Sequence, residues 1–150
     1  MEKIWLRHYL PGVPKTLELD PEESLVDLLN ASCEEFARNP AFTNFGHTIT
    51  YAELDDLSAR FAAHLQTETS LQRGDRVALM LPNLLQFPVA MFGILRSGFV
   101  TVNINPLYTP PELEHQLNDS GAKVIVISST SAATLDKVIG NTDIEHVIVT

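Results

Sequence analysis

The chain has 150 residues, of which 45% are hydrophobic and 19% charged, a composition typical of one globular domain with a single sizeable core. Its formal net charge of -9, without a cluster of Lys and Arg, argues against a nucleic-acid partner, because backbone phosphates would be repelled. Cys33 is the single cysteine, which excludes a disulfide or thiolate metal cluster within one chain and favours a reducing, cytoplasmic location.

Neither an export signal nor a membrane span is expected. Residues 1–12 mix charged with apolar side chains and contain no uninterrupted apolar segment of signal-peptide length. The apolar segment 77–104 is interrupted by prolines and polar residues, so it falls short of the roughly 18 clean apolar residues of a membrane helix. It is interpreted as protein core.

The N-terminal part predicts an arm followed by a helix. Residues 11–14 contain two prolines and should be extended. Between residues 24 and 39, apolar side chains recur at the spacing of one helix face, and they are Leu25, Leu29, Cys33 and Phe36.

A β-hairpin and a second helix are expected next. Residues 41–45 and 48–51 have the pattern of two strands separated by the turn 46–47, whose glycine can supply a positive φ. Thr50 and Glu53 have the spacing of a capping box and predict the start of a helix. The apolar face of that helix carries Leu54, Leu57, Phe61 and Leu65.

From residue 77 onward, short apolar strands alternate with helices. Strands are predicted at 77–81, 99–104, 124–127 and 147–149. Start and stop signals predict three intervening helices. The first covers residues 84–95 before Gly98, and the second begins with the Thr109/Glu112 capping box and Pro110 and ends at Gly121. The third is marked by Leu135, Val138 and Ile139 and ends at Gly140.

The resulting βαβαβαβ order defines the fold class as α/β. Right-handed crossovers make such a chain a mostly parallel sheet with helices on both faces. The arm, the first helix and the hairpin precede this sheet and should pack around it. No boundary is expected inside residues 1–150.

Several local patterns resemble chemical motifs but favour structural roles. Gly93 and Gly98 have the spacing of a phosphate-binding loop, yet Phe99 and Val100 replace the Lys and Ser/Thr that would hold phosphate and magnesium. The Glu-x-x-His pair at Glu112 is a single copy, whereas di-iron bundles need two, so a helix surface is the better interpretation and no metal ligand is assigned. Neither a GxGxxG nor a GxSxG motif is present, and no catalytic or cofactor-binding residue is assigned.

Position alone suggests where a ligand would bind. In open α/β sheets, ligands bind beyond the carboxyl ends of the strands. At those ends lie Asn83, Asn105 and Tyr108, and Ser128–Ser129 follow the third strand. The simplest interpretation of the two asparagines is that their side chains form hydrogen bonds with backbone groups at the strand exits. Tyr108 has two interpretations, as a packing residue or as a residue that lines a cleft. All three are therefore candidate substrate-cleft residues.

Four segments resemble the acyl-adenylate-forming enzymes, which comprise acyl-CoA synthetases, luciferases and the adenylation domains of peptide synthetases. Residues 49–54 (ITYAEL) and 93–106 (GILRSGFVTVNINP) resemble the first two core motifs of that superfamily. Residues 74–83 (GDRVALMLPN) and 105–122 (NPLYTPPELEHQLNDSGA) are similar to bacterial long-chain fatty acid-CoA ligases. The resemblance extends over essentially the whole chain, including the arm around Trp5.

The resemblance implies that the full-length protein activates a long-chain fatty acid with ATP and Mg2+ to an acyl-adenylate, and then transfers the acyl group to coenzyme A. It implies that residues 1–150 are the N-terminal subdomain of the AMP-binding large domain. The phosphate loop, ribose-binding acid and C-terminal lysine of the family have no matching position here, so the isolated chain is expected to be inactive. Some long-chain ligases of the family form homodimers through the N-terminal region, which makes the arm and the first helix a candidate self-association surface. Peripheral membrane contact at the inner face is also expected, although the acidic balance offers no polybasic anchor.

Two alternatives stay open at this point. The first is an adenylate-forming ligase for an aromatic, medium-chain or amino acid. The second is a stand-alone α/β interaction or dimerisation module without catalytic activity, favoured by the lack of a phosphate site between residues 1 and 150.

Overall fold

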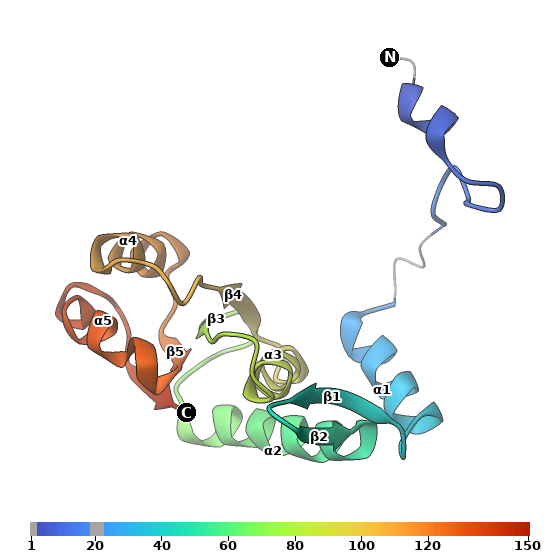
Figure 1. Cartoon of the computed structure of the whole chain (residues 1–150). Coiled ribbons are helices and arrows are strands. Elements are labelled where there is room, and N and C mark those ends of the chain that lie inside the picture. The colour runs from blue at the N-terminus through green and yellow to red at the C-terminus, as the bar shows by residue number, and fades with distance from the viewer. Residues whose placement is uncertain (1–2, 19–22) are drawn as a thin grey trace.

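The computed structural model describes residues 3–18 and 23–150. A short 3-10 helix in the arm is followed by helix α1, the β1–β2 hairpin, helix α2, and then strands β3 to β6 with helices α3 to α5 between them (Figure 1). The bounds are η1 Ile4–His8, α1 Leu25–Glu35, β1 Pro40–Asn44, β2 His47–Thr50, α2 Tyr51–Glu68, β3 Arg76–Met80, α3 Gln86–Arg96, β4 Val100–Asn103, α4 Pro110–Ser120, β5 Val124–Ile127, η2 Ser129–Ser131, α5 Ala132–Asp136, η3 Ile139–Asn141 and β6 His146–Val149.

Strands β3 to β6 form a parallel sheet in the order β4-β3-β5-β6. In this register Ala78 of β3 lies between Val102 of β4 and Ile125 of β5. Strand β5 in turn pairs with β6. This confirms the α/β fold class, and the continuous apolar strands are explained because both faces of the sheet are covered.

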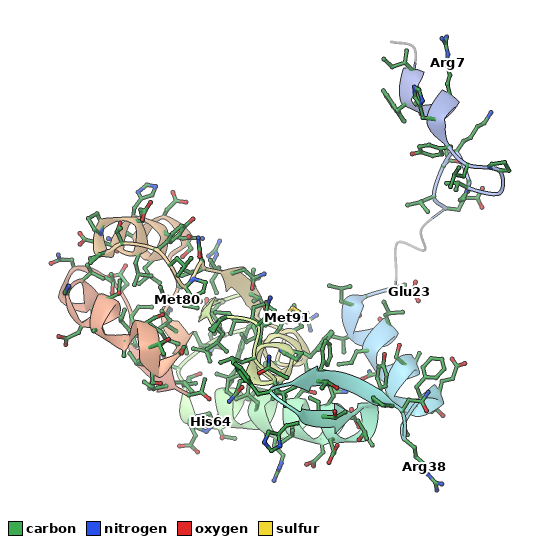
Figure 2. The ribbon with its side chains drawn as sticks, viewed as in Figure 1. Arg7, Glu23, Arg38, His64, Met80 and Met91 are labelled. Carbon is green, nitrogen blue, oxygen red and sulfur yellow. The ribbon has the colours of Figure 1, made fainter. Side chains whose placement is uncertain are left out.

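Each face of the sheet has its own core cluster. Helices α2 and α3 cover one face and α4 and α5 cover the other (Figure 1). Alternate residues of one strand belong to opposite clusters, as the period of a strand requires: Val77 and Leu79 face α3, whereas Ala78 and Met80 face α4. Figure 2 shows Met80 inside this body and Arg7 on the arm, which extends away from it.

The hairpin is present, but its turn lies one residue earlier than expected. Asn44 pairs with His47, so the turn residues are Phe45 and Gly46, with φ of 47° and 78°. Two-residue turns of this kind need positive φ at both central positions, and only the glycine predicts a positive φ from its residue type. Tyr51, expected at the end of the second strand, instead begins α2.

Both predicted capping boxes are confirmed. At the start of α2 the Thr50 backbone N–H donates to Glu53 Oε2 at 2.8 Å, and at the start of α4 the Thr109 N–H donates to Glu112 Oε2 at the same distance. Gly121 ends α4 with a left-handed φ of 63°. The local signals were therefore sufficient to place the start of α2 and both ends of α4.

The helix predicted to end at Gly140 is shorter than expected. Helix α5 stops at Asp136, and Gly140 lies inside the 3-10 turn η3 rather than ending a helix. The Val138 N–H donates to the carbonyl of Leu135, three residues back, which tightens the chain out of α-helical geometry. Val138 is nevertheless buried, so the spacing of the apolar residues in this segment indicates burial and not a continuous helix.

Helix α1 buries less of its predicted face than expected. Leu29 and Cys33 are buried, whereas Leu25 is 62% exposed and Phe36 lies just beyond the helix at its C-cap. Within the described residues, no helix combines the length and the apolar character needed to cross a bilayer.

Candidate substrate site at the carboxyl edge of the sheet

The carboxyl ends of the four parallel strands lie at one edge of the sheet. Met80 of β3 is aligned with Ile127 of β5, and Ile127 with Val149 of β6. The ladder continues one residue further, since the Ser128 N–H donates to the Met80 carbonyl and the Thr150 N–H to the Ile127 carbonyl. The loops that leave these strands are therefore neighbours, as the sequence predicted for a ligand site.

The loop after β4 brings together two of the three candidate residues. Asn105 is exposed, and its Oδ1 accepts from the Leu107 N–H at 3.0 Å. Its carbonyl accepts from the Tyr108 N–H at 3.1 Å, which closes a turn. Tyr108 is half-buried against the α4/α5 core cluster. Both residues thus have a structural role at this strand exit, as expected for an asparagine in a turn.

The third candidate residue, Asn83, is exposed in the loop between β3 and α3. Its carbonyl accepts from Asn44 Nδ2 at 2.9 Å, and Asn44 belongs to the hairpin. Asn83 therefore contacts the hairpin, whereas Asn105 and Tyr108 lie on the α4 side of the sheet.

Serine hydroxyls at the exit of β5 form hydrogen bonds within their own loop and to the loop after β4. The Ser128 hydroxyl lies 2.8 Å from that of Thr130 and accepts from the Thr130 N–H at 3.3 Å. Ser131 Oγ donates to the Pro106 carbonyl, which links the exits of β5 and β4. These groups fix the loops to one another.

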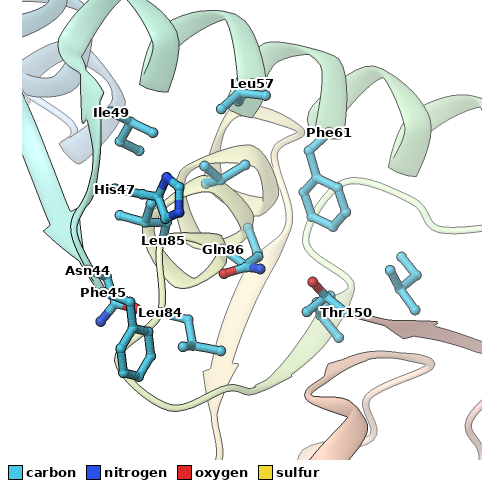
Figure 3. Close-up of a pocket in the computed structure, with 14 residues that line it drawn as sticks. Asn44, Phe45, His47, Ile49, Leu57, Phe61, Leu84, Leu85, Gln86 and Thr150 are labelled. Atoms are coloured by element: carbon cyan, nitrogen blue, oxygen red, sulfur yellow. The ribbon is translucent and has the colours of Figure 1, made fainter.

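A pocket of about 610 Å³ opens beside this edge, on the face covered by α2 and α3 (Figure 3). Its walls are mostly apolar, and a few polar side chains stand among them. We call it the edge pocket, and its lining residues are Asn44, Phe45, His47, Ile49, Leu57, Phe61, Leu84, Leu85, Gln86, Val89, Ala90, Val126, Ile148 and Thr150.

Sequence reasoning missed the edge pocket because its walls come from distant segments. The hairpin, α2, the start of α3 and the last strand each contribute only a few residues. Phe45 is an aromatic residue in a turn and is 88% exposed, but single exposed apolar side chains are common and indicate no site by themselves.

The ionisable groups with shifted pKa values have structural causes. The hydroxyl and N–H of Thr109 lower the pKa of the Glu112 carboxyl, so Glu112 acts in helix capping. Burial raises the pKa of the Cys33 thiol, with a further contribution from Asp55. Among residues 3–18 and 23–150, no group of three or more His, Cys, Asp or Glu side chains could hold a metal ion.

The glycine pair that resembles a phosphate loop is explained by helix packing. A Cβ on Gly93 would lie 2.7 Å from Phe61 Cδ1 and 3.0 Å from the Ser58 carbonyl oxygen, so Gly93 permits the close approach of α3 to α2. Gly98 follows α3 with a φ of 80°.

The parallel sheet with helices on both faces is the fold found in the N-terminal domains of adenylate-forming ligases. The sequence pattern of one family, described as "AMP-binding enzyme", matches residues 29–150, and the chain belongs to this family.

Individual relatives agree with this assignment. The chain is 55% identical over 150 residues to a long-chain-fatty-acid–CoA ligase of Escherichia coli O6:H1 (strain CFT073), covering 100% of the chain and 27% of the relative. It is 39% identical over 97 residues to 4-coumarate–CoA ligase 5 of Oryza sativa subsp. japonica, covering 65% of the chain and 18% of the relative. The crystal structure of a long-chain-fatty-acid-CoA ligase from Archaeoglobus fulgidus aligns with a TM-score of 0.82 at 27% identity, covering 95% of this chain and 30% of that one. The chain thus spans less than a third of the length of these proteins.

Proposed function

We propose that this chain is the N-terminal part of a long-chain fatty acid-CoA ligase. The observation that carries the proposal is the 55% identity to the E. coli ligase over all 150 residues, arm included. Similarity to the 4-coumarate ligase is lower and extends over only 97 residues. A match that includes the arm favours the long-chain acid as substrate.

The proposed reaction has two steps. A carboxylate oxygen of the fatty acid attacks the α-phosphorus of ATP, and pyrophosphate leaves to give the acyl-adenylate. The thiol of coenzyme A then attacks the acyl carbon, and AMP leaves with the bonding electrons. Mg2+ and cationic or amide donors would stabilise the charge that develops on the phosphate.

In this proposal residues 1–150 are the N-terminal subdomain of the AMP-binding large domain, and the ATP-binding parts and the C-terminal domain follow in the complete protein. The catalytic residues belong to those later parts. The subdomain contributes the carboxyl edge of its sheet, where Asn83, Asn105 and Tyr108 would line the substrate cleft.

The activity is tested with the complete native gene product. Supplied with Mg-ATP, coenzyme A and hexadecanoic acid, it should release AMP and form the thioester, whereas the chain of residues 1–150 alone should do neither. Complete protein that releases no AMP with any long-chain acid would refute the proposal.

The cleft role of Tyr108 has a separate test. Tyr108→Phe retains the packed ring but removes the hydroxyl, so the KM for the acid or for ATP should rise roughly threefold if that hydroxyl contacts substrate. Leu107→Ala, which changes an 86% exposed neighbour in the same loop, is the control. Identical kinetics for Tyr108→Phe and the native enzyme would leave Tyr108 with packing alone.

A second candidate is an adenylate-forming ligase for a different carboxylic acid, because the 4-coumarate ligase shares 39% identity with the chain. The discriminating experiment compares kcat/KM across a panel of long-chain, medium-chain and aromatic acids. Highest kcat/KM with an aromatic acid would replace the long-chain proposal with this one.

Location and assembly complete the proposal. A cytoplasmic enzyme that contacts the inner face of the membrane would meet its fatty acid substrate there. The arm exposes Ile4, Trp5 and Leu10 and is the proposed contact of a homodimer. Deletion of residues 1–18 from the complete enzyme should then convert dimer to monomer in analytical ultracentrifugation.

A further inference from the structure

The arm carries the opposite charge to the rest of the chain. Residues 3–17 contain three of the ten Lys and Arg residues and none of the nineteen Asp and Glu residues, so this segment has a charge of +3 and the remainder of the chain -12. A basic segment on an acidic chain is typical of a part that has its own, negatively charged partner.

The same segment presents apolar and aromatic side chains to solvent. Every residue from 3 to 17 except the half-buried Leu6 is exposed, including Trp5 at 51% and Leu10 at 75%. None of the described core clusters contains an arm residue. Because the arm extends away from the body (Figure 1, Figure 2), the body does not cover this apolar surface.

The surface of an anionic bilayer fits this combination of side chains. Trp and Tyr prefer the level of the lipid headgroups because their rings are amphipathic, and aliphatic side chains insert just below that level. Lys side chains can lay their methylene groups on apolar surface and keep the ammonium group among lipid phosphates. Three basic residues are fewer than the roughly four to eight of a polybasic anchor, so insertion of apolar side chains must supply part of the affinity.

We propose that residues 3–17 form a membrane-surface anchor that binds anionic phospholipid, with Trp5, Tyr9 and Leu10 in the interface and Lys3 and Lys15 beside lipid phosphates. This inference deepens the proposed function, because it names the part of the chain that makes the proposed membrane contact. The remainder of the chain stays off the surface, since its charge of -12 repels anionic lipid within a Debye length of about 8–10 Å.

Lipid is a better partner for the arm than a second copy of the chain. The homodimer contact proposed for the arm uses the same side chains, so the two partners are alternatives. Contact between two arms would place two segments of +3 against one another. An acidic surface on a second copy would satisfy the basic groups alone, whereas a bilayer accommodates the basic and the apolar side chains together.

Vesicle cosedimentation of the complete protein tests the inference in the absence of ATP and fatty acid. Vesicles made of equal parts phosphatidylglycerol and phosphatidylcholine should bind the protein roughly tenfold or more tightly than vesicles of phosphatidylcholine alone. Molar salt should remove most of that difference, because it shortens the Debye length to about 3 Å.

Two pairs of substitutions separate the basic from the apolar contribution. Lys3→Gln with Lys15→Gln removes charge, and Trp5→Ala with Leu10→Ala removes apolar surface. Each pair should lower the affinity for the mixed vesicles roughly tenfold. The arm lies outside the described core clusters, so the body stays folded in these variants.

Matched controls make the same kinds of change at exposed positions of the body. Lys137→Gln removes a basic charge, and Leu107→Ala shortens a leucine that is 86% exposed. Both controls should bind the mixed vesicles as the native protein does. A loss of binding in the controls that matches the loss in the arm variants would assign lipid binding to the body and overturn the inference.

Other results would also overturn it. One is the absence of binding to either kind of vesicle. Another is an arm variant that dissociates a lipid-free dimer in analytical ultracentrifugation, since that would assign the arm to a second copy. AMP release in vesicle-free solution is measured on the same preparations. Active enzyme that binds no vesicles refutes the anchor alone, and vesicle binding by a complete protein that releases no AMP refutes the ligase alone.

Discussion

The two faces of the sheet are covered to different degrees. Under α4 and α5, Leu113, Leu117 and Ile125 are at most 1% exposed. Under α2 and α3, the buried core is equally apolar near Leu79 and Ile94, but it ends in the open edge pocket beside Leu57. The core under α4 and α5 is therefore closed around Leu113 and Leu117, whereas the α2/α3 face presents an open apolar surface beside Leu57.

Local sequence signals follow the same division. The closed face is built from one continuous segment in which a capping box, a proline and a left-handed Gly121 define α4. The open face combines α3 with α2 and the hairpin, which come from earlier in the chain. The stability of elements that are joined by long-range contacts depends more on the rest of the molecule than the stability of elements with local contacts does.

The largest expected effect compares one leucine from each face. Leu117→Ala should lower the free energy of unfolding of the 150-residue chain by about 3 kcal/mol, because it leaves a cavity in a closed core. Leu57→Ala, at the open pocket, should cost less than about 1 kcal/mol because water can fill the space. Urea denaturation measures both. Equal losses would mean that the α2/α3 face is closed in solution.

The next effect concerns the contact between α2 and α3. Gly93→Ala places a Cβ 2.7 Å from Phe61 Cδ1 and 3.0 Å from a carbonyl oxygen of α2, so the helices must separate, at a cost of about 2 kcal/mol. The control is Gly140→Ala, where an added Cβ meets nothing within 4 Å. Thermal unfolding should separate the two variants by several degrees, and matching melting temperatures would contradict the close packing.

A polar link between three helices gives a smaller effect. Arg96 of α3 donates to the Asp55 carbonyl at 3.0 Å and to Asn30 Oδ1 at 2.8 Å, and also pairs with the Asp55 carboxylate. Arg96→Ala removes these contacts and should cost about 1.5 kcal/mol. Arg60→Ala, which breaks an exposed pair with Asp56, should cost less than about 0.5 kcal/mol. Chemical denaturation of the two variants checks the ratio, and similar losses would show that the Arg96 link contributes no more than a surface pair.

The sequence predicted the elements whose determinants are local. Short apolar segments identified the four parallel strands of the described sheet, and the Thr50/Glu53 and Thr109/Glu112 spacings identified two helix starts. It failed where a tertiary contact decides the conformation. Val138 is buried from a non-helical segment, and Phe45 adopts a positive φ of 47° that is uncommon for an aromatic residue.

The same reasoning applies to the candidate site. The rule that ligands bind at the carboxyl ends of strands predicts a site at the edge that carries Asn83 and Asn105, and this stays a prediction. It could not reveal the edge pocket, because Asn44 and Val126 are brought together only by the folded chain. Periodicity describes one element at a time, so a wall assembled from a hairpin, two helices and a sheet leaves no local pattern.

The smallest expected effect is a pH dependence shared by both faces. Hydrogen bonds from the Thr109 side chain and backbone lower the pKa of Glu112 at the start of α4, and the corresponding bonds from Thr50 lower the pKa of Glu53 at the start of α2. Since each folded pKa lies below the unfolded value of about 4.3, the stabilisation is fully present above that value and is lost as the pH falls through the folded pKa. Glu112→Gln and Glu53→Gln should therefore each flatten the decline in urea midpoint between about pH 5 and pH 3. The two substitutions should act alike although their helices cover opposite faces, because both carboxylates are exposed and their interactions are local. A pH response that differs between the two variants would show that the open α2/α3 face also weakens the capping hydrogen bonds of α2.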